Sequence, residues 1–212
     1  MPLARRTLLA MPLGALALAA LSGLAAAAEE APDALVMRIS GEVIEAAKAD
    51  KSIQAGDVQK IIVLVDAKVM PSLDFKRMTA SAVGRYWRQA TPEQQQRLQE
   101  EFKTLLVRSY AGALKQVKDQ TVQLKPMRSR PEDEEVVVRT EVRGKGDPIQ
   151  LDYRLEKKDD GWKIYDVNVL GVWLVQNYTS SFAQEIGANG IDGLIAKLAE
   201  RNKSAAANGT KS

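Results

Sequence analysis

The hydrophobic residues in the first part of the chain recur at the spacing of an α-helix. Over residues 33–50 they fall on one face, and Asp33 can cap the start of this helix. A second helix is predicted over 58–69; because its middle is apolar on all sides, we expect it to be buried or to line a cavity. A third helix is predicted to begin after Asp74.

The clearest helix start lies at Thr91-Pro92-Glu93-Gln94. Thr91 suits the N-cap, Pro92 suits the first helical position, and Gln94 completes a capping box. The helix that follows keeps its apolar residues on one face, namely Leu98, Phe102, Leu105, Leu106, Tyr110, Ala113, Leu114 and Val117. This pattern predicts a long amphipathic helix.

From residue 122 onward the hydrophobic period changes to two, which is typical of β-strands. Four strands are predicted, at 122–124, 136–142, 149–155 and 162–170. In the last of them the alternation slips, because Trp162 and Ile164 fall on one face whereas Tyr165, Val167 and Val169 fall on the other. A β-bulge, or burial of both faces, would explain the slip.

Two further helices are predicted at 174–186 and 191–198, and residues 204–212 are expected to form a disordered tail. The chain thus consists of helices, a four-stranded antiparallel meander and helices again. This order predicts a single α+β domain over residues 29–203.

Residues 1–28 have the features of a secretory signal peptide. Arg5-Arg6 precedes an uncharged run rich in Leu and Ala, which ends at Ala26-Ala27-Ala28 and is followed by Glu29-Glu30. We expect export with cleavage after Ala28. A membrane anchor is the alternative, and Arg5-Arg6 is also similar to a twin-arginine signal.

The composition excludes several kinds of chemistry. The chain has no Cys and no His, which excludes the usual zinc sites, histidine-based triads and thiol nucleophiles. Without Arg5 and Arg6, 28 basic residues remain against 27 acidic residues, a net charge of +1. We therefore predict no metal site, no catalytic residue and no nucleic-acid partner.

The acidic residues and the glycine-containing turns provide no convincing catalytic or ligand-binding motif. The alternation turns Asp152 toward water, and Asp166 suits a structural hydrogen bond. Asp159-Asp160-Gly161 is predicted to be a hairpin turn, since it lacks the spacing of an EF-hand loop. Gly144-Lys145-Gly146 opens no helix and is therefore predicted to be a hairpin tip rather than a phosphate loop.

Some segments carry more hydrophobic residues than the surface of a sheet or helix needs. From Val167 to Val175, seven of nine residues are apolar, and the helix at 58–69 is a second such segment. For each single residue, a place in the core is the simplest interpretation. Together these segments predict an apolar hollow between the sheet and the helices.

Three stretches resemble one known family. They are 69-VMPSLDFKRMTASAVGRYWRQATPEQQQRLQEEFKTLLVRSYAGAL-114, 162-WKIYDVNVLGVWLVQNY-178 and 190-GIDGLIAKL-198. Their order and spacing are similar to those of the MlaC, or toluene-tolerance, family of periplasmic phospholipid-binding proteins. Many members carry an acidic residue at the position of Leu170, a small polar residue at Trp173 and a basic residue at Thr179.

The resemblance implies a curved four-stranded antiparallel sheet wrapped by helices, like the nuclear-transport-factor fold, around an apolar cavity. It implies a periplasmic, monomeric carrier with a phospholipid as cargo and no other cofactor. It also implies two partners: the MCE-domain protein of an inner-membrane ABC transporter, and an outer-membrane lipoprotein–porin complex. Such a carrier shuttles lipid between the two membranes and maintains outer-membrane asymmetry.

The apolar segments and the resemblance together define a set of predicted lining residues. The set comprises Val69, Met70, Leu73, Phe75, Met78, Val83, Trp87, Phe102, Leu106, Tyr110, Val138, Leu151, Tyr153, Val167, Val169, Val172 and Trp173. Two alternatives stay open. One is an isomerase-like enzyme on the same fold, which would use Asp166 with Tyr165 or Tyr153. The other is a periplasmic chaperone or assembly factor with an external apolar groove.

Overall fold

A computed structural model describes residues 29–130 and 132–209 of the chain, so the predicted signal peptide at 1–28 lies outside the described residues. One antiparallel sheet has the strand order β1-β2-β3-β4-β5. The strands are β1 Thr121–Leu124, β2 Glu135–Arg143, β3 Ile149–Lys158, β4 Gly161–Val169 and β5 Val172–Trp173. The predicted α+β class and antiparallel meander are confirmed. The sheet gains a fifth strand, which is too short for a periodic signal.

The helices are α1 Pro32–Ala49, α2 Lys51–Ala55, α3 Val58–Lys68, α4 Phe75–Val83, α5 Pro92–Lys115 and α6 Leu174–Gly209, with the 3-10 turns η1 Met70–Ser72 and η2 Gly84–Gln89. The capping box predicted at the start of α5 is present: Gln94 donates its backbone N–H to the Thr91 hydroxyl at 3.2 Å. In return, the Thr91 N–H donates to the Gln94 side chain at 3.0 Å.

Four helical features differ from the predictions. Asp33 does not cap α1, whose N-cap is Ala31 without a side-chain hydrogen bond. Helix α2 was not predicted; it begins where the Asp50 carboxylate accepts the N–H of Ser52 at 2.7 Å. Helix α3 is not buried on all sides, because the side chain of Val63 is 64% exposed. The two predicted C-terminal helices meet at Gly190, whose φ of 72° breaks the helical geometry of α6. Helix α6 then continues to Gly209, within the segment expected to be disordered.

The slip in β4 is a β-bulge at Tyr165. Opposite β3, Leu155 pairs with Ile164 and Arg154 pairs with Asp166, so Tyr165 is the extra residue. Beyond the bulge, Tyr153 pairs with Val167 and Leu151 pairs with Val169. Ile164, Val167 and Val169 therefore share one face of the sheet, because their partners alternate regularly along β3. We call this the inner face and the opposite one the outer face.

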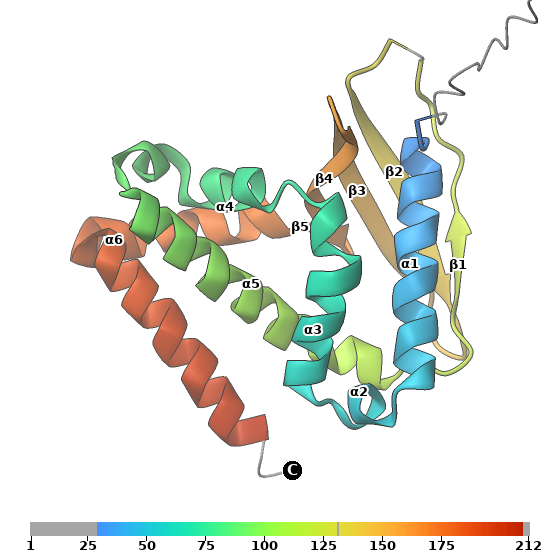
Figure 1. Cartoon of the computed structure of the whole chain (residues 1–212), viewed down its shortest axis with the longest axis horizontal. Helices are drawn as coiled ribbons and strands as arrows, with labels where there is room; N and C mark the ends of the chain where they lie inside the picture. Colours follow the sequence, from blue (N-terminus) through green and yellow to red (C-terminus); the bar gives the residue numbers. More distant parts are fainter. Residues whose placement is uncertain (1–28, 131, 210–212) are drawn as a thin grey trace, which may run out of the picture.

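The sheet lies on one side of the molecule and helices α4, α5 and α6 on the other, with α1 in front of the strands (Figure 1). Leu35, Val36 and Ile39 of α1 pack with Val138 and Leu155 of the inner face in one core cluster. A second cluster joins α4, α5 and α6, and a third joins α1, α2, α3 and α5. Among these clusters the sheet packs mainly against α1, while α4, α5 and α6 form a core of their own, so part of the inner face is not covered by α1.

Phe102 is the centre of the helical core. It has no exposed surface, and its ring lies 5.9 Å from that of Phe75, 5.1 Å from Tyr178 and 5.3 Å from Phe182, between ring centroids. The contacts with Tyr178 and Phe182 are edge-to-face, and contacts of this kind add to the free energy of burial. This cluster fixes α4, α5 and the first half of α6 relative to one another.

Candidate functional site

The end of the inner face near the β4–β5 turn is apolar but only half-buried. Leu151 and Val169 pair across β3 and β4, and Val172 pairs with Val169 across β4 and β5. None of the three belongs to the core clusters formed by the described residues. Val172 is 47% exposed. This part of the sheet therefore has apolar surface that the packing of the described residues does not bury.

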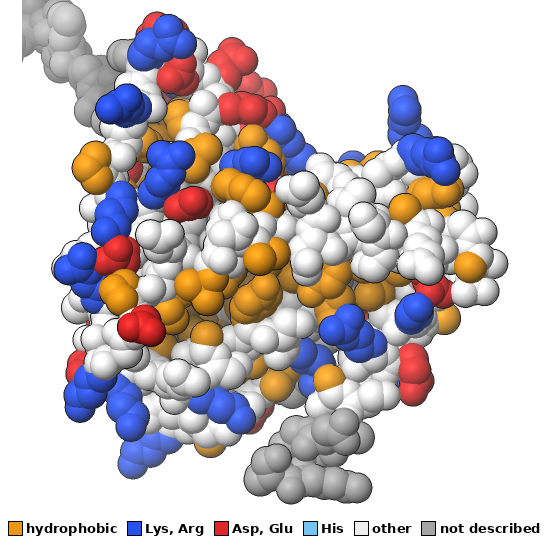
Figure 2. All heavy atoms as spheres, turned by 180° about the vertical axis from the view of Figure 1, so that it is seen from behind, with side chains coloured by type: hydrophobic (Ala, Val, Ile, Leu, Met, Phe, Trp, Pro, Cys, Tyr) orange, Lys and Arg blue, Asp and Glu red, His pale blue; other side chains and the backbone are white. Residues whose placement is uncertain are grey.

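Helix α5 contributes apolar side chains that are also incompletely covered. Leu106 packs at the edge of the helical core, and Tyr110, one turn further on, is 38% exposed. Burial raises the pKa of Tyr110 above its ordinary value, which further favours the neutral phenol. Seen from behind, apolar side chains form a band across the middle of the molecule, partly recessed on the side nearer the sheet (Figure 2). We call the incompletely buried apolar residues of the inner face and of α5 the candidate site: Leu151, Val167, Val169, Leu106 and Tyr110.

Tyr153 is a polar group deeper on the inner face. Burial raises its pKa, and hydrogen bonds to Ser40 of α1 and Thr140 of β2 partly offset that rise. A neutral hydroxyl with satisfied hydrogen bonds can lie beside hydrocarbon at little cost. Tyr153 therefore links α1 to the sheet without making the inner face charged.

The predicted lining residues divide into groups. One group belongs to or packs against the helical core: Met70, Phe75, Met78, Val83, Trp87, Phe102 and Leu106. A second group faces or borders the inner face of the sheet: Val69, Leu73, Val138, Leu151, Tyr153, Val167 and Val169. Tyr110 and Val172 are exposed, as described above. The structure does not bring all of them together, because Phe75, Met78, Val83 and Phe102 are sealed within the helices.

Trp173 lies on the other side of the sheet. It pairs with Asn168, which alternates with Val167 and Val169 and therefore points to the outer face. There the guanidinium carbon of Arg154 lies 3.8 Å from the centroid of the Trp173 ring. The apolar run did not reveal this, because a strand alternates its side chains whatever their polarity. Ile149 shares the inner face with Leu151, as the alternation in the sequence indicated, but it was not included among the predicted lining residues.

Asp166, the main candidate for catalysis, has a structural environment. It is 3% exposed and accepts the backbone N–H groups of Val167 at 2.9 Å and Val175 at 3.1 Å. Arg154 donates to its second oxygen at 3.4 Å. Burial raises the pKa of Asp166, while these N–H groups and Arg154 act in the opposite direction. The expected structural hydrogen bond is therefore present.

The proposed catalytic partners of Asp166 do not form a site with it. Tyr153 lies on the inner face, so the sheet separates the two side chains. Tyr165 shares the outer face with Asp166, but its hydroxyl donates to Glu135 at 3.3 Å and its ring lies under Arg77. The geometry therefore gives no support to the isomerase-like alternative.

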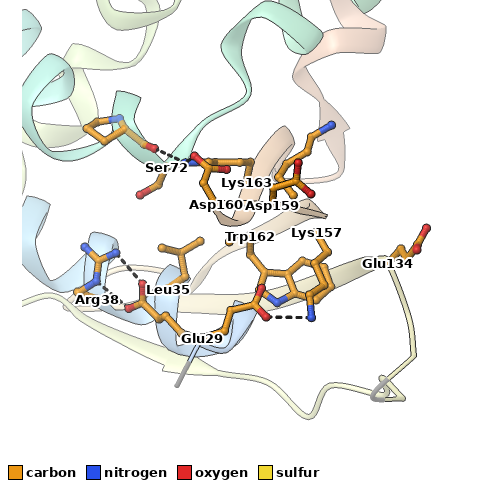
Figure 3. A pocket seen from close by; sticks show the side chains of 14 residues that line it. Glu29, Leu35, Arg38, Ser72, Glu134, Lys157, Asp159, Asp160, Trp162 and Lys163 are labelled. Atoms are coloured by element: carbon orange, nitrogen blue, oxygen red, sulfur yellow. Dashed lines mark hydrogen bonds and ion pairs between the residues drawn. The ribbon is translucent and has the colours of Figure 1, made fainter. Parts of the chain in front are cut away.

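A separate cleft of about 810 Å³ lies between the start of α1, η1 and the β3–β4 hairpin (Figure 3). Its charged side chains are largely paired: Arg38 with Glu30 at 2.7 Å, Lys157 with Glu29 at 2.9 Å and Lys163 with Asp160 at 2.9 Å. None of the predicted lining residues borders this cleft. Such a surface would leave hydrocarbon next to charge, so it does not suit an acyl chain.

No group of three or more acidic side chains in the described ranges 29–130 and 132–209 is arranged to hold a metal ion. Within the same ranges, no helix combines the length and the apolar character needed to cross a bilayer.

The structure is an α+β domain whose sheet and helix α5 both carry apolar side chains that the described residues do not fully cover, as is common where a protein binds an apolar ligand. The chain belongs to the MlaC protein family, whose family model matches residues 37–200. The resemblance found in the sequence is thereby confirmed.

Two curated relatives and one solved structure agree with this assignment. The chain is 27% identical over 200 residues to the toluene tolerance protein ttg2D of Pseudomonas putida, across 91% of this chain and 93% of that protein. It is 23% identical over 177 residues to the intermembrane phospholipid transport system binding protein MlaC of Haemophilus influenzae, across 82% and 83% of the two chains.

The solved structure is a phospholipid-binding protein from Ralstonia solanacearum in complex with a phospholipid. It is 47% identical to this chain, superposes with a TM-score of 0.79, and is matched over 82% of this chain and 98% of its own. The names of the Haemophilus and Ralstonia proteins describe binding and transport, not catalysis.

Proposed function

We propose that this protein is a periplasmic phospholipid carrier that holds acyl chains against the inner face of the sheet. The observation that carries the proposal is the Ralstonia protein, which binds a phospholipid and shares 47% of its residues with this chain across nearly its whole length. The incompletely buried apolar side chains of the inner face and of α5 support the same function, namely Leu151, Val167, Val169, Leu106 and Tyr110. We leave Trp173 out of the proposed site because it faces the other side of the sheet.

The energetics of a phospholipid explain why a carrier needs no catalytic group. Two acyl chains contain roughly 30 methylene groups, and exposing each to water costs about 0.8 kcal/mol. Unaided transfer through water therefore faces a cost on the order of 20 kcal/mol. A carrier that returns most of this free energy makes the exchange of lipid nearly balanced, so direction must come from its partners.

The proposal includes location and partners. Residues 1–28 would direct export to the periplasm, leaving the domain from residue 29 onward to shuttle lipid. The partners would be the MCE-domain protein of an inner-membrane ABC transporter and an outer-membrane lipoprotein–porin complex. The carrier would act as a monomer, with phospholipid as its cargo and no further cofactor.

Lipid mass spectrometry tests the proposal directly. Protein purified from the periplasm and extracted with organic solvent should yield about one phospholipid per chain. A chaperone should instead purify without lipid and bind unfolded peptides. Lipid-free protein from cells that contain normal phospholipid would contradict the carrier function.

A further inference from the structure

The turn between β4 and β5 places a leucine in an unfavourable backbone conformation. Val169 pairs with Val172, so Leu170 and Gly171 form a two-residue hairpin loop. Their φ angles are 52° and 90°, as in a type I′ turn, which favours Asn-Gly. A leucine at positive φ is disfavoured because its Cβ crowds the following carbonyl oxygen. The fold would be served better by Asn at this position.

Leu170 also exposes hydrocarbon to water. Its side chain is 65% exposed, that of Val172 is 47% exposed, and that of Ile149 is 39% exposed. These three residues lie at one corner of the sheet, because the Leu170 N–H donates to the carbonyl of Gln150 at 3.1 Å. We call them the apolar corner. It continues directly from Val169 and Leu151, which belong to the candidate site.

The hairpin is held in place rather than loose. The Asn168 side chain accepts the N–H of Gly171 at 2.8 Å, and Asn168 itself is buried. Asp166, further back along β4, accepts the N–H of Val175 at the start of α6. Hydrogen bonds on both sides of the turn therefore fix Leu170 in its exposed position.

We propose that the apolar corner, with Leu170 at its tip, is the lip over which acyl chains enter and leave the candidate site. This inference rests on the proposed function. A methylene group that crosses from the site to a recipient is exposed to water in between, and contact with Leu170 shortens that exposed path. Such a lip lowers the barrier in both directions equally. It therefore governs the rate of exchange and leaves the equilibrium occupancy unchanged.

The test compares Leu170→Asn with Val63→Asn. Asn tolerates the turn, so Leu170→Asn removes the hydrocarbon while suiting the backbone. Val63 is a matched control: it is 64% exposed, lies on α3, and Val and Asn have similar helix propensities. The probe is phosphatidylethanolamine with one fluorescent acyl chain, loaded on the protein and released into vesicles of phosphatidylethanolamine and phosphatidylglycerol. Uptake from such vesicles is measured in the same way.

Leu170→Asn should slow release and uptake by about tenfold, or about 1.4 kcal/mol in the barrier, while occupancy by mass spectrometry stays at the wild-type level. Leu170→Gly should slow both rates in the same way, and Val63→Asn should change neither. Unchanged rates in Leu170→Asn, an equal effect of Val63→Asn, or a loss of occupancy without a change in rate would overturn the lip. Wild-type protein that takes up no lipid from vesicles would overturn it as well.

The two proposals fail in different ways. Wild-type protein that carries no phospholipid after purification from the periplasm contradicts the carrier function itself. Wild-type protein that carries phospholipid and exchanges it no faster than Leu170→Asn leaves the carrier function intact and removes only the role of Leu170.

Discussion

Asp166 of β4 accepts a hydrogen bond of 3.1 Å from the backbone N–H of Val175, in the first turn of α6. The first N–H groups of a helix have no partner within the helix, so this carboxylate satisfies one of them. The bond crosses the β4–β5 hairpin and joins the sheet to the helical core. Asp166 therefore holds the start of α6 against the sheet, and its ionisation should affect the free energy of unfolding.

The buried carboxylate of Asp166 should change how the free energy of unfolding depends on pH. Burial raises the folded-state pKa of Asp166 above its unfolded value of about 3.9, so the folded protein binds the proton more tightly. The stability contributed by this proton is present below the unfolded pKa and is lost as the pH rises through the folded pKa. The free energy of unfolding of the wild type, minus that of Asp166→Asn, should therefore decrease with rising pH across this window.

Urea unfolding of both proteins, each stripped of lipid, at a series of pH values measures this difference. Subtracting the variant cancels the other carboxyl groups, including Glu30, Glu141 and Glu156, whose pKa values are lowered by their basic partners. A difference that grows with pH would mean that the N–H groups and Arg154 outweigh burial, and the expected direction of the pKa shift would be wrong.

Filling the candidate site should displace lipid without unfolding the protein. Val169 is half-buried and lies outside the core clusters of the described residues, so Val169→Trp can place its ring in the space assigned to acyl chains. Displacing about two methylene groups at about 0.8 kcal/mol each should lower affinity for phospholipid roughly tenfold. Lipid mass spectrometry on protein purified from the periplasm measures the change in occupancy.

Val137→Trp is the matched control for this variant. Val137 is also a half-buried valine on a strand, but it pairs with Arg154 and therefore points to the outer face. Its substitution should leave occupancy unchanged. If both variants, or neither, lost phospholipid while their circular dichroism spectra stayed native, the inner face would not be the binding surface.

The sequence predicted the elements whose signals are local and regular. The capping box at Thr91 and Gln94 and the apolar face of α5 require only short-range pattern, and both are present in the structure. The break in the alternation of apolar residues along β4 could also be seen in the sequence. Which residue is the extra one could not be predicted, because that depends on the register with β3, where Tyr165 has no partner. Helix α2 and strand β5 are too short to show a period at all.

The site was harder to predict than the fold, because hydrophobicity does not say what covers a side chain. Phe102 and Val169 are both apolar and both lie on regular elements, yet Phe102 is sealed by aromatic rings and Val169 is left half-open. That distinction arises from the packing of elements distant in sequence. The face of the sheet to which Trp173 points likewise depends on the two-residue turn at Leu170 and Gly171, which pairs Trp173 with Asn168. The location of lipid within the inner face stays a prediction.

A charged cluster on the outer face connects α4 to the sheet. The guanidinium carbon of Arg77 lies 3.6 Å from the centroid of the Tyr165 ring, the residue that forms the bulge. The same guanidinium pairs with Glu135 of β2 at 2.8 Å and with Glu156 of β3 at 2.5 Å. Arginine suits this arrangement because its planar group can stack on a ring while its edge donates to Glu135 and pairs with the charge of Glu156.

Arg77→Lys should therefore destabilise the fold although it keeps the charge. A lysine ammonium can neither stack flat on Tyr165 nor pair with both carboxylates in the same geometry, and we expect a loss of about 1 kcal/mol in the free energy of unfolding. Urea unfolding measures it. Arg85→Lys is the control, because Arg85 stacks more loosely on Tyr86, at 4.9 Å, and is exposed; its urea midpoint should not change. Equal effects of the two substitutions would show that the bulge at Tyr165 gains no stability from the arginine stacked on it.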